Sequence, residues 1–401
     1  MSRRGALDAV VAGGGVVGAA AALMLAREGL QVALVEAQRP HAWQRAARDL
    51  RVYAFARDNA QLLADLGVWQ QVLASRIQPY RRMQVWDAAG GEPLVFDADA
   101  LGQPQLGWIV EHALLVDALW NALPAAGVRV HCPARIEALE QSDAGVRLRL
   151  DDGLQLDARL AIAADGANSS LRGLAGIGDT SHDYAQQGVV AFVASTEPHR
   201  DTCWQRFLPS GPVAFLPFAA DPPATEWRGR IGSIVWTLPD AEAQRVRALD
   251  DDAFARELGA AFGGELGAMA MLSPRAAFPL QRQLADLYVQ GRVLLLGDAA
   301  HVVHPLAGQG VNLGLRDVAA LRELARDASK RGVDIASRHR LARWARARKS
   351  ENALNAYALN AINRAYSSDE MVPTLLRGHA LGFANRLPPL SRALWRHAAG
   401  L

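Results

Sequence analysis

Hydrophobic and polar positions near the N-terminus predict a strand, a glycine turn, a helix and a second strand. Leu7 to Ala12 is a short apolar run, and the segment Gly13-Gly14-Gly15-Val16-Val17-Gly18 follows it directly. An alanine-rich stretch then continues to about Glu28 and stops at Gly29, which is typical of a buried helix. Residues 31–35 predict a second strand, which ends on Glu36. The spacing therefore predicts a strand–helix–strand unit whose helix begins at glycine.

Two later segments also predict buried strands that end on an acid beside a glycine. The first is LAIAADGANSSLR, from Leu160 to Arg172, in which the apolar run meets Asp165-Gly166. The second is VLLLGDAAHVVHPLAGQGVNLGLRD, from Val293 to Asp317, in which it meets Gly297-Asp298. Each segment alone also fits an ordinary crossover or an Asx-turn. Taken together, three strand-end acids beside glycines favour a nucleotide site.

The remaining patterns predict a second sheet and a helical end. Residues 146–159 alternate about Asp151-Asp152-Gly153 as a hairpin does. Short strands are predicted at 188–195, 203–208, 213–218 and 230–238, and an amphipathic helix after Gly310. From 336 onward the pattern is helical. We therefore divide the chain into five parts. The nucleotide-binding domain takes residues 1–80, 81–182 and 276–335. An antiparallel sheet is inserted at 183–275, and C-terminal helices follow at 336–401.

The glycine pattern G-x-G-x-x-G stands in the context that dinucleotide binding requires. Gly13 can make the tight turn, Gly15 can admit a pyrophosphate, and Gly18 can let the helix approach the strand. Glu36 lies 23 residues after Gly13, where a carboxylate can accept hydrogen bonds from ribose hydroxyls. The sequence therefore predicts a bound dinucleotide.

A signal peptide or membrane span is the alternative for the N-terminus. A signal peptide or span is suggested by the basic start at residues 1–4 and the uncharged run at 9–26. Three consecutive glycines near the centre of the run and the strand ending on Glu36 do not fit that alternative, so we favour the nucleotide unit.

Composition favours a cytoplasmic enzyme. The 401 residues allow two domains and a large core, and the net charge of +2 gives no case for nucleic acid. Cys132 and Cys203 are the only cysteines, without the spacing of a metal site, so we expect neither a disulfide framework nor a metal.

The order of the three motifs resembles FAD-dependent aromatic hydroxylases of the para-hydroxybenzoate hydroxylase class. The stretch GDAAHVVHPLAGQGVNLGLRD is similar, more narrowly, to the ubiquinone-biosynthesis hydroxylases. Four shorter segments are also similar to this subgroup: residues 51–54, 66–69, 110–111 and 118–120. The resemblance covers nearly the whole chain. It implies an α/β fold with a Rossmann-like FAD-binding domain, an inserted antiparallel β-sheet substrate domain and a helical C-terminus.

The resemblance also implies the reaction. Non-covalent FAD is reduced by NADH or NADPH, which binds transiently, and O2 then gives a C4a-hydroperoxyflavin that hydroxylates a phenol ring. Glu36 is expected on the adenosine ribose and Asp298 on the ribityl or pyrophosphate region. The expected cofactor-binding residues are Gly13, Gly15, Gly18, Glu36, Arg51, His112, Asp165, Asp298, Gly308, Gly310 and Asn312. His112 stands where the subgroup often has asparagine and other relatives have glutamine or arginine.

The resemblance also implies catalytic candidates in the loop between Asp298 and Gly308. Pro305 is expected beside the flavin ring, where a carbonyl can orient the reacting oxygen. His301 and His304 are candidate acid–base groups, although either could equally pack or bond a backbone carbonyl.

The substrate implied by the resemblance is a polyprenylated phenol or quinone precursor of ubiquinone. Phe215, Phe218 and Trp236 could line an opening for its tail, or could fill the core of the sheet. The basic run from Arg338 to Lys349 is more simply a solvated helix face, but it could contact anionic lipid. We therefore expect peripheral association with the inner face of the membrane. The resemblance also implies a complex with other quinone-pathway proteins.

Two other functions stay open. The chain could hydroxylate a small soluble aromatic compound with the same chemistry, or it could be a non-catalytic flavoprotein subunit. The intact Gly15, Asp165, Asp298 and Gly310 argue against the last.

Overall fold

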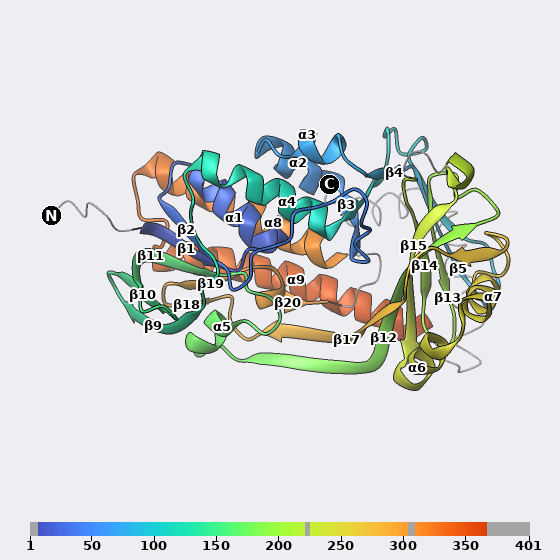
Figure 1. Cartoon of the computed structure of the whole chain (residues 1–401). Helices are drawn as coiled ribbons and strands as arrows, with labels where there is room; N and C mark the ends of the chain where they lie inside the picture. Colours follow the sequence, from blue (N-terminus) through green and yellow to red (C-terminus); the bar gives the residue numbers. More distant parts are fainter. Residues whose placement is uncertain (1–6, 221–224, 304–308, 367–401) are drawn as a thin grey trace.

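The computed structural model describes residues 7–220, 225–303 and 309–366. Figure 1 shows two lobes, one built of helices on a mostly parallel sheet and the other of a curved, mostly antiparallel sheet with its own helices. Two long strands, β12 (Asp179–Ser195) and β17 (Ala276–Ala285), run from the first lobe into the second. The long helix α9 (Arg338–Tyr366) extends beneath both lobes.

The first lobe is centred on an eight-stranded sheet with the path β18-β19-β11-β1-β2-β8. Strands β1, β2, β8, β11 and β19 pair in parallel, while β9 and β10 add an antiparallel extension. Because helices cover parallel sheets on their faces, β2, β19 and the C-terminal halves of β1 and β11 are apolar without alternation, whereas the first half of β11 alternates. The strands are β1 (Leu7–Ala12), β2 (Val32–Val35), β8 (Arg129–His131), β9 (Ile136–Ser142), β10 (Gly145–Leu150), β11 (Gln155–Ala163), β18 (Val289–Gln290) and β19 (Val293–Leu295).

Helix α1 (Val16–Arg27) lies at the centre of this lobe, packed between α4 (His112–Ala122) and α8 (Gln309–Arg331). Its residues from Ala19 to Leu25 are all buried. Four consecutive alanines allow this close packing because their side chains add little bulk on any face. Short helices complete the lobe at α2 (Arg57–Asp65), α3 (Trp69–Leu73) and α5 (Ser170–Leu174).

The second lobe is a nine-stranded sheet with the path β20-β17-β12-β15-β14-β13-β5-β6, and β16 also pairs with β12. Helices α6 (Asp240–Ala248) and α7 (Asp251–Ala261) cover one face. The other strands are β5 (Arg82–Asp87), β6 (Leu94–Asp97), β13 (Thr202–Phe207), β14 (Val213–Pro217), β15 (Ile231–Pro239), β16 (Met269–Met271) and β20 (His301–Val302).

This sheet does not coincide with the predicted insertion at 183–275. Strands β5 and β6 come from earlier in the chain, and β5 pairs in parallel with β13. Strand β17 lies beyond residue 275 and pairs with β12 over most of its length. Sequence pattern predicted four of the strands correctly, but pairing between distant segments carries no local signal.

A three-stranded sheet joins the lobes, with β7 (Gly107–Glu111) between β3 (Val52–Ala56) and β4 (Gln78–Tyr80). Val52 pairs with Glu111, which brings Arg51 and Tyr53 beside His112 at the start of α4. The sheet therefore places three polar side chains together from segments sixty residues apart in the chain.

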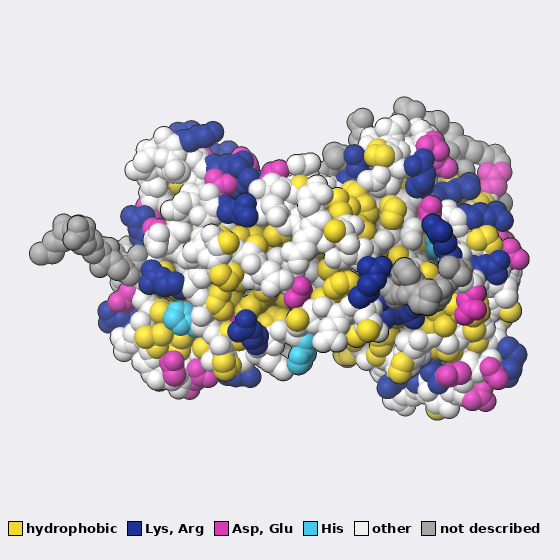
Figure 2. Space-filling view, turned by 45° about the horizontal axis from the view of Figure 1, so that its top comes forward, with side chains coloured by type: hydrophobic (Ala, Val, Ile, Leu, Met, Phe, Trp, Pro, Cys, Tyr) yellow, Lys and Arg dark blue, Asp and Glu magenta, His cyan; other side chains and the backbone are white. Residues whose placement is uncertain are grey.

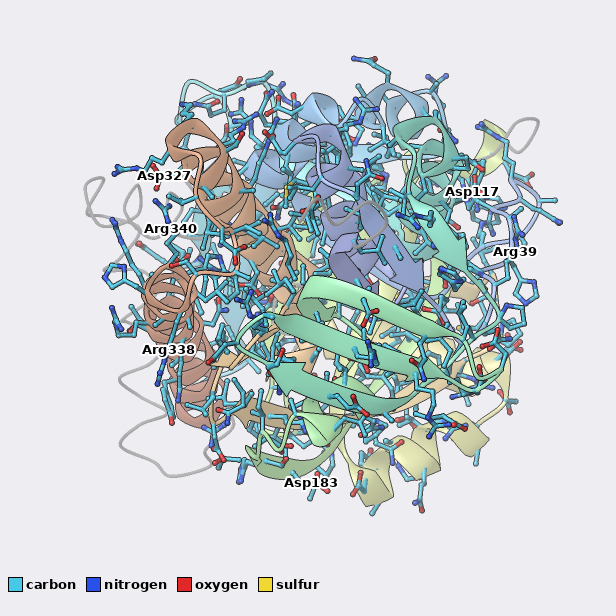
Figure 3. All side chains as sticks on the ribbon, turned by 90° about the vertical axis from the view of Figure 1, so that its left-hand side faces the viewer. Arg39, Asp117, Asp183, Asp327, Arg338 and Arg340 are labelled. Atoms are coloured by element: carbon cyan, nitrogen blue, oxygen red, sulfur yellow. The ribbon has the colours of Figure 1, made fainter. Side chains whose placement is uncertain are left out.

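The basic run at the start of α9 is only partly solvated. Arg340 pairs with Asp327 at 2.5 Å, Arg348 is buried against Asp317, and the Lys349 ammonium donates to the Asp286 carbonyl at 2.6 Å. Arg338, Arg343 and Arg346 are exposed. Figure 3 shows Arg340 beside Asp327, with Arg338, the first residue of α9, further from Asp327. Among the described residues, no helix is both long and apolar enough to cross a bilayer.

Candidate functional site

A single cavity of about 880 Å³ brings the three sequence motifs together. It is lined by Gly13, Gly15 and Glu36 of the first motif, by Asp165, and by Asp298 with Gly310. Its far wall is the face of the second sheet that helices α6 and α7 leave uncovered. Figure 2 shows hydrophobic side chains gathered along the narrow waist between the two lobes.

The glycine turn has the geometry that the sequence predicted. Gly13 has φ +99°, and a Cβ there would lie 2.3 Å from the Ala164 carbonyl oxygen. A Cβ on Gly18 would lie 2.0 Å from the Gly13 carbonyl oxygen, because α1 passes close to the first strand. Around Gly15, by contrast, no protein atom lies within 4 Å of an added Cβ. The space above Gly15 belongs to the cavity, so bare backbone is presented there to a ligand.

The Glu36 carboxylate is held at the end of β2 beside this turn. It accepts hydrogen bonds from the backbone N–H groups of Gly14, at 2.5 Å, and Gln38, at 2.9 Å. The Trp120 indole N–H donates to the Gly14 carbonyl at 2.7 Å and supports the turn from α4. Trp120 was noted in the sequence only as part of the resemblance, since nothing in its local pattern predicts a contact 106 residues away.

The Asp165 carboxylate lines the cavity and also organises its own turn. It accepts hydrogen bonds from the Ser169 hydroxyl and from the backbone N–H of Leu171, at 3.1 Å. Arg172, in the same turn, donates to the Ala299 carbonyl at 3.0 Å and pairs with Asp179 at 3.1 Å. Arg172 therefore connects the turn that follows Asp165 to the Gly297–Ala299 turn. The sequence did not predict this contact.

Arg51, Tyr53 and His112 also line the cavity. The Tyr53 hydroxyl lies 2.9 Å from His112 Nδ1, and the Arg51 guanidinium lies over the Tyr53 ring, 5.7 Å from its centroid. Burial lowers the pKa of His112 to about 4, and the Arg51 charge acts in the same direction. Burial also raises the pKa of Tyr53. Both side chains are therefore neutral at physiological pH.

Asn312 does not face the cavity, which corrects the expectation for its side chain. It is fully buried, accepts a hydrogen bond from the Ala56 backbone N–H at 3.0 Å, and donates to the Ala54 carbonyl at 2.8 Å. It also bonds Asn59. Asn312 thus joins α8 to β3 and α2, and it supports the strand that carries Tyr53.

His301 is also part of the packing rather than of the cavity wall. Its Nε2 lies 2.7 Å from Asp317, both side chains have no exposed surface, and neither lines the cavity. Burial alone would raise the pKa of Asp317, but the charges of His301 and Arg348 and their hydrogen bonds hold it below its usual value. The candidates His304, Pro305 and Gly308 lie outside the described residues.

The proposed tail-lining aromatics do not line the cavity. Phe215 and Trp236 pack beneath α6 and α7, and Phe218 packs against Phe192 at a ring-centroid distance of 4.7 Å. Because side chains alternate along a strand, their neighbours Ala214, Leu216, Val235 and Thr237 line the cavity instead. The alternative that these aromatics fill the core of the sheet is therefore the correct one.

The residues around the cavity fit FAD. The open backbone at Gly15 suits a pyrophosphate, and Glu36 suits a ribose. Arg51 and His112 can donate hydrogen bonds to oxygens of the cofactor. Gly310 lies at the start of α8, and a Cβ there would meet no protein atom within 4 Å. A flavin could therefore contact the backbone at that helix start, near the positive end of the dipole.

Comparisons with known proteins agree with this fit. Residues 6–350 match the family described as "FAD binding domain". The chain is 36% identical over 396 residues to the "3-demethoxyubiquinol 3-hydroxylase" of Escherichia coli (strain K12), covering 98% of each chain. It is 37% identical over 397 residues to the "Ubiquinone hydroxylase UbiL" of Rhodospirillum rubrum, covering 98% of this chain and 89% of that one.

Solved structures share the fold. PqsL from Pseudomonas aeruginosa, in complex with 2-aminobenzoylacetate, superposes with a TM-score of 0.77 at 22% identity, covering 94% of this chain and 99% of that chain. The p-nitrophenol 4-monooxygenase PnpA from Pseudomonas putida DLL-E4 gives a TM-score of 0.76 at 18% identity, covering 97% and 96%. By family match, identity and coverage, the chain belongs to the FAD-dependent hydroxylases of ubiquinone biosynthesis.

Proposed function

We propose that the chain hydroxylates the aromatic ring of a polyprenylated phenol or quinone precursor of ubiquinone, using NAD(P)H and O2. The family membership supports the reaction class. The relatives named above are a demethoxyubiquinol hydroxylase and a ubiquinone hydroxylase, which supports the same class of substrate here.

The observation that carries the proposal is the charge-free wall of the cavity. The residues of the second sheet that line it include Met83, Val190, Ala214, Leu216 and Val235, and no described Asp, Glu, Lys, Arg or His of that sheet is among them. The polar side chains on that wall, such as Gln205 and Thr237, are neutral. A substrate carboxylate would be desolvated there without a partner, which costs several kcal/mol. A neutral ring with an apolar tail has no such cost.

The residues of the chain would act mainly by position and electrostatics. FAD, when bound, supplies the oxygen-activating redox chemistry, with electrons from NAD(P)H. The N-terminal dipole of α8 at Gly310 favours negative charge on the bound cofactor. The apolar wall excludes water and holds the ring against the cofactor, which raises the effective concentration of the two reactants.

Peripheral membrane contact is a finer part of the same proposal. Arg338, Arg343 and Arg346 stay exposed on α9, whereas the other cations of that run have internal partners. Each exposed arginine near anionic lipid contributes about 1 kcal/mol. Binding to anionic vesicles should therefore weaken as salt is raised, and the triple variant of these arginines to glutamine should bind less at low salt.

A direct experiment compares two substrates in one assay. Purified holoprotein with NADH or NADPH is given a short-chain prenylphenol, or the same ring bearing a carboxylate. We expect a ring-hydroxylated product from the neutral compound alone. If only small aromatic acids are hydroxylated, the soluble-aromatic alternative replaces the proposal. If no aromatic compound stimulates NAD(P)H oxidation, the non-catalytic alternative does.

A further inference from the structure

We propose that Tyr53 is a positioning residue that fixes the His112 ring in one tautomer, so that His112 Nε2–H donates a hydrogen bond into the cavity. The acceptor would be an oxygen in the ribityl or pyrophosphate part of FAD. The proposal rests on the flavin site, and it assigns Tyr53 a role that does not require contact with the substrate.

The two side chains come from different elements and meet at a defined angle. Tyr53 lies on β3, and His112 is the first residue of α4. Their rings are edge to face, with centroids 5.9 Å apart and planes at 73°, and the phenol oxygen lies 2.9 Å from Nδ1. This hydrogen bond fixes which edge of the imidazole faces the cavity.

The direction of the hydrogen bond follows from what surrounds the phenol. Tyr53 is buried, and its hydroxyl has one described hydrogen-bond acceptor, His112 Nδ1. Arg51 also lies beside the phenol but can only donate, and among the described contacts neither Asp49 nor Asp298, whose charges also act on Tyr53, accepts a hydrogen bond from it. The phenol proton therefore goes to Nδ1. A neutral imidazole carries a single N–H, so the ring proton is on Nε2.

The position of this donor suits the middle of the cofactor. Arg51 and His112 both line the cavity, and Asp298 is close enough to raise the pKa of Tyr53. A guanidinium and a neutral N–H therefore line the same cavity as the acid that is expected near the ribityl chain. This combination matches a ligand section that is rich in hydroxyl and phosphate oxygens.

The tautomer itself can be measured on the unmodified holoprotein. Nitrogen-15 NMR of histidine-labelled protein distinguishes a protonated Nε2 from a protonated Nδ1, and the His112 signals are assigned by their loss in His112→Leu. We expect the proton on Nε2 across pH 6–8. A proton on Nδ1 would overturn the proposal without any variant of Tyr53.

The positioning role is tested by FAD affinity in two backgrounds. Tyr53→Phe should weaken FAD binding about tenfold in the parent protein. This corresponds to about 1.4 kcal/mol, which one misplaced hydrogen bond can cost. In His112→Leu, which has no donor to position, Tyr53→Phe should cause no further loss. Equal losses in both backgrounds would instead mean that Tyr53 contacts FAD directly, and no loss in the parent would mean that it does not act at all.

A matched control is available in the same sheet, on β4, which β7 separates from β3. Tyr80 is as buried as Tyr53 but does not line the cavity. Tyr80→Phe should leave FAD affinity unchanged. A loss like that of Tyr53→Phe would show a general effect of removing a buried phenol and would contradict the proposal.

Discussion

The buried pair of Arg76 and Glu111 should be one of the main supports of the flavin site. Arg76 donates to both oxygens of Glu111, at 2.7 and 3.1 Å, and neither side chain has exposed surface. It also donates to the carbonyls of Arg45, at 2.7 Å, and Ala47, at 2.8 Å. These contacts hold the irregular segment before β3, which carries Arg51 to the cavity.

Arg76→Met keeps the volume but removes the charge and all four of these hydrogen bonds. Of its donors among the described residues, the Glu111 carboxylate would then retain the Trp43 indole N–H, at 3.1 Å, and the Asp49 backbone N–H, at 2.9 Å. Breaking a buried pair in this way costs about 3–5 kcal/mol, because the remaining charge stays uncompensated. With an unfolding entropy of about 2.1 cal/mol/K per residue, this is a fall in Tm of roughly 4–6 °C.

Calorimetry of the holoprotein measures the effect, with Arg147→Met as the control. Arg147 pairs with Asp157 at 2.8 Å, but both side chains are about half exposed, so Tm should not change measurably. The double variant Arg76→Met with Glu111→Leu should recover part of the loss because no lone charge remains. If Arg76→Met leaves Tm unchanged, or if the double variant is no more stable than the single one, the reasoning is refuted.

Three further predictions concern the cavity. Gly15→Val should abolish FAD binding while circular dichroism stays unchanged, because its side chain enters only the cavity; normal flavin occupancy would contradict this. Ala214→Phe should raise KM with little change in Tm, whereas Phe215→Ala should cost about 3–5 kcal/mol of stability; the reverse pattern would overturn the assigned faces of β14. The pKa of His112 is lowered to about 4, so the stability it contributes is present above its ordinary pKa near 6.5 and is lost as pH falls through 4. Replacing His112 with asparagine should flatten the unfolding free energy over that range, and an unchanged profile would refute the shift.

Local sequence predicted which motif residues would lie together around the cavity. Gly13, Gly15 and Glu36 act at a turn within one strand–helix–strand unit, so their spacing alone fixes their geometry. Asp165 and Asp298 follow buried strands, and β11 and β19, which precede them, are neighbours in one sheet. Parallel pairing brings such strand ends together at the same edge.

The substrate half could not be predicted in the same way. The aromatic character of Phe215 and Trp236 suggested a tail-lining role, but a shift of one residue along a strand reverses the face, and the sequence does not show which face α6 and α7 cover. Asn312 was misjudged because its partners Ala54 and Ala56 lie more than 250 residues away. The Tyr53–His112 contact likewise depends on the pairing of β3 with β7.

The most direct test of the proposed function is the quinone profile of a strain that lacks this gene. We predict that ubiquinone falls and that a prenylated precursor lacking one ring hydroxyl accumulates. The parent gene should restore ubiquinone, whereas the Gly15→Val variant should not. Unchanged ubiquinone and precursor levels in the deletion strain would contradict the proposed function.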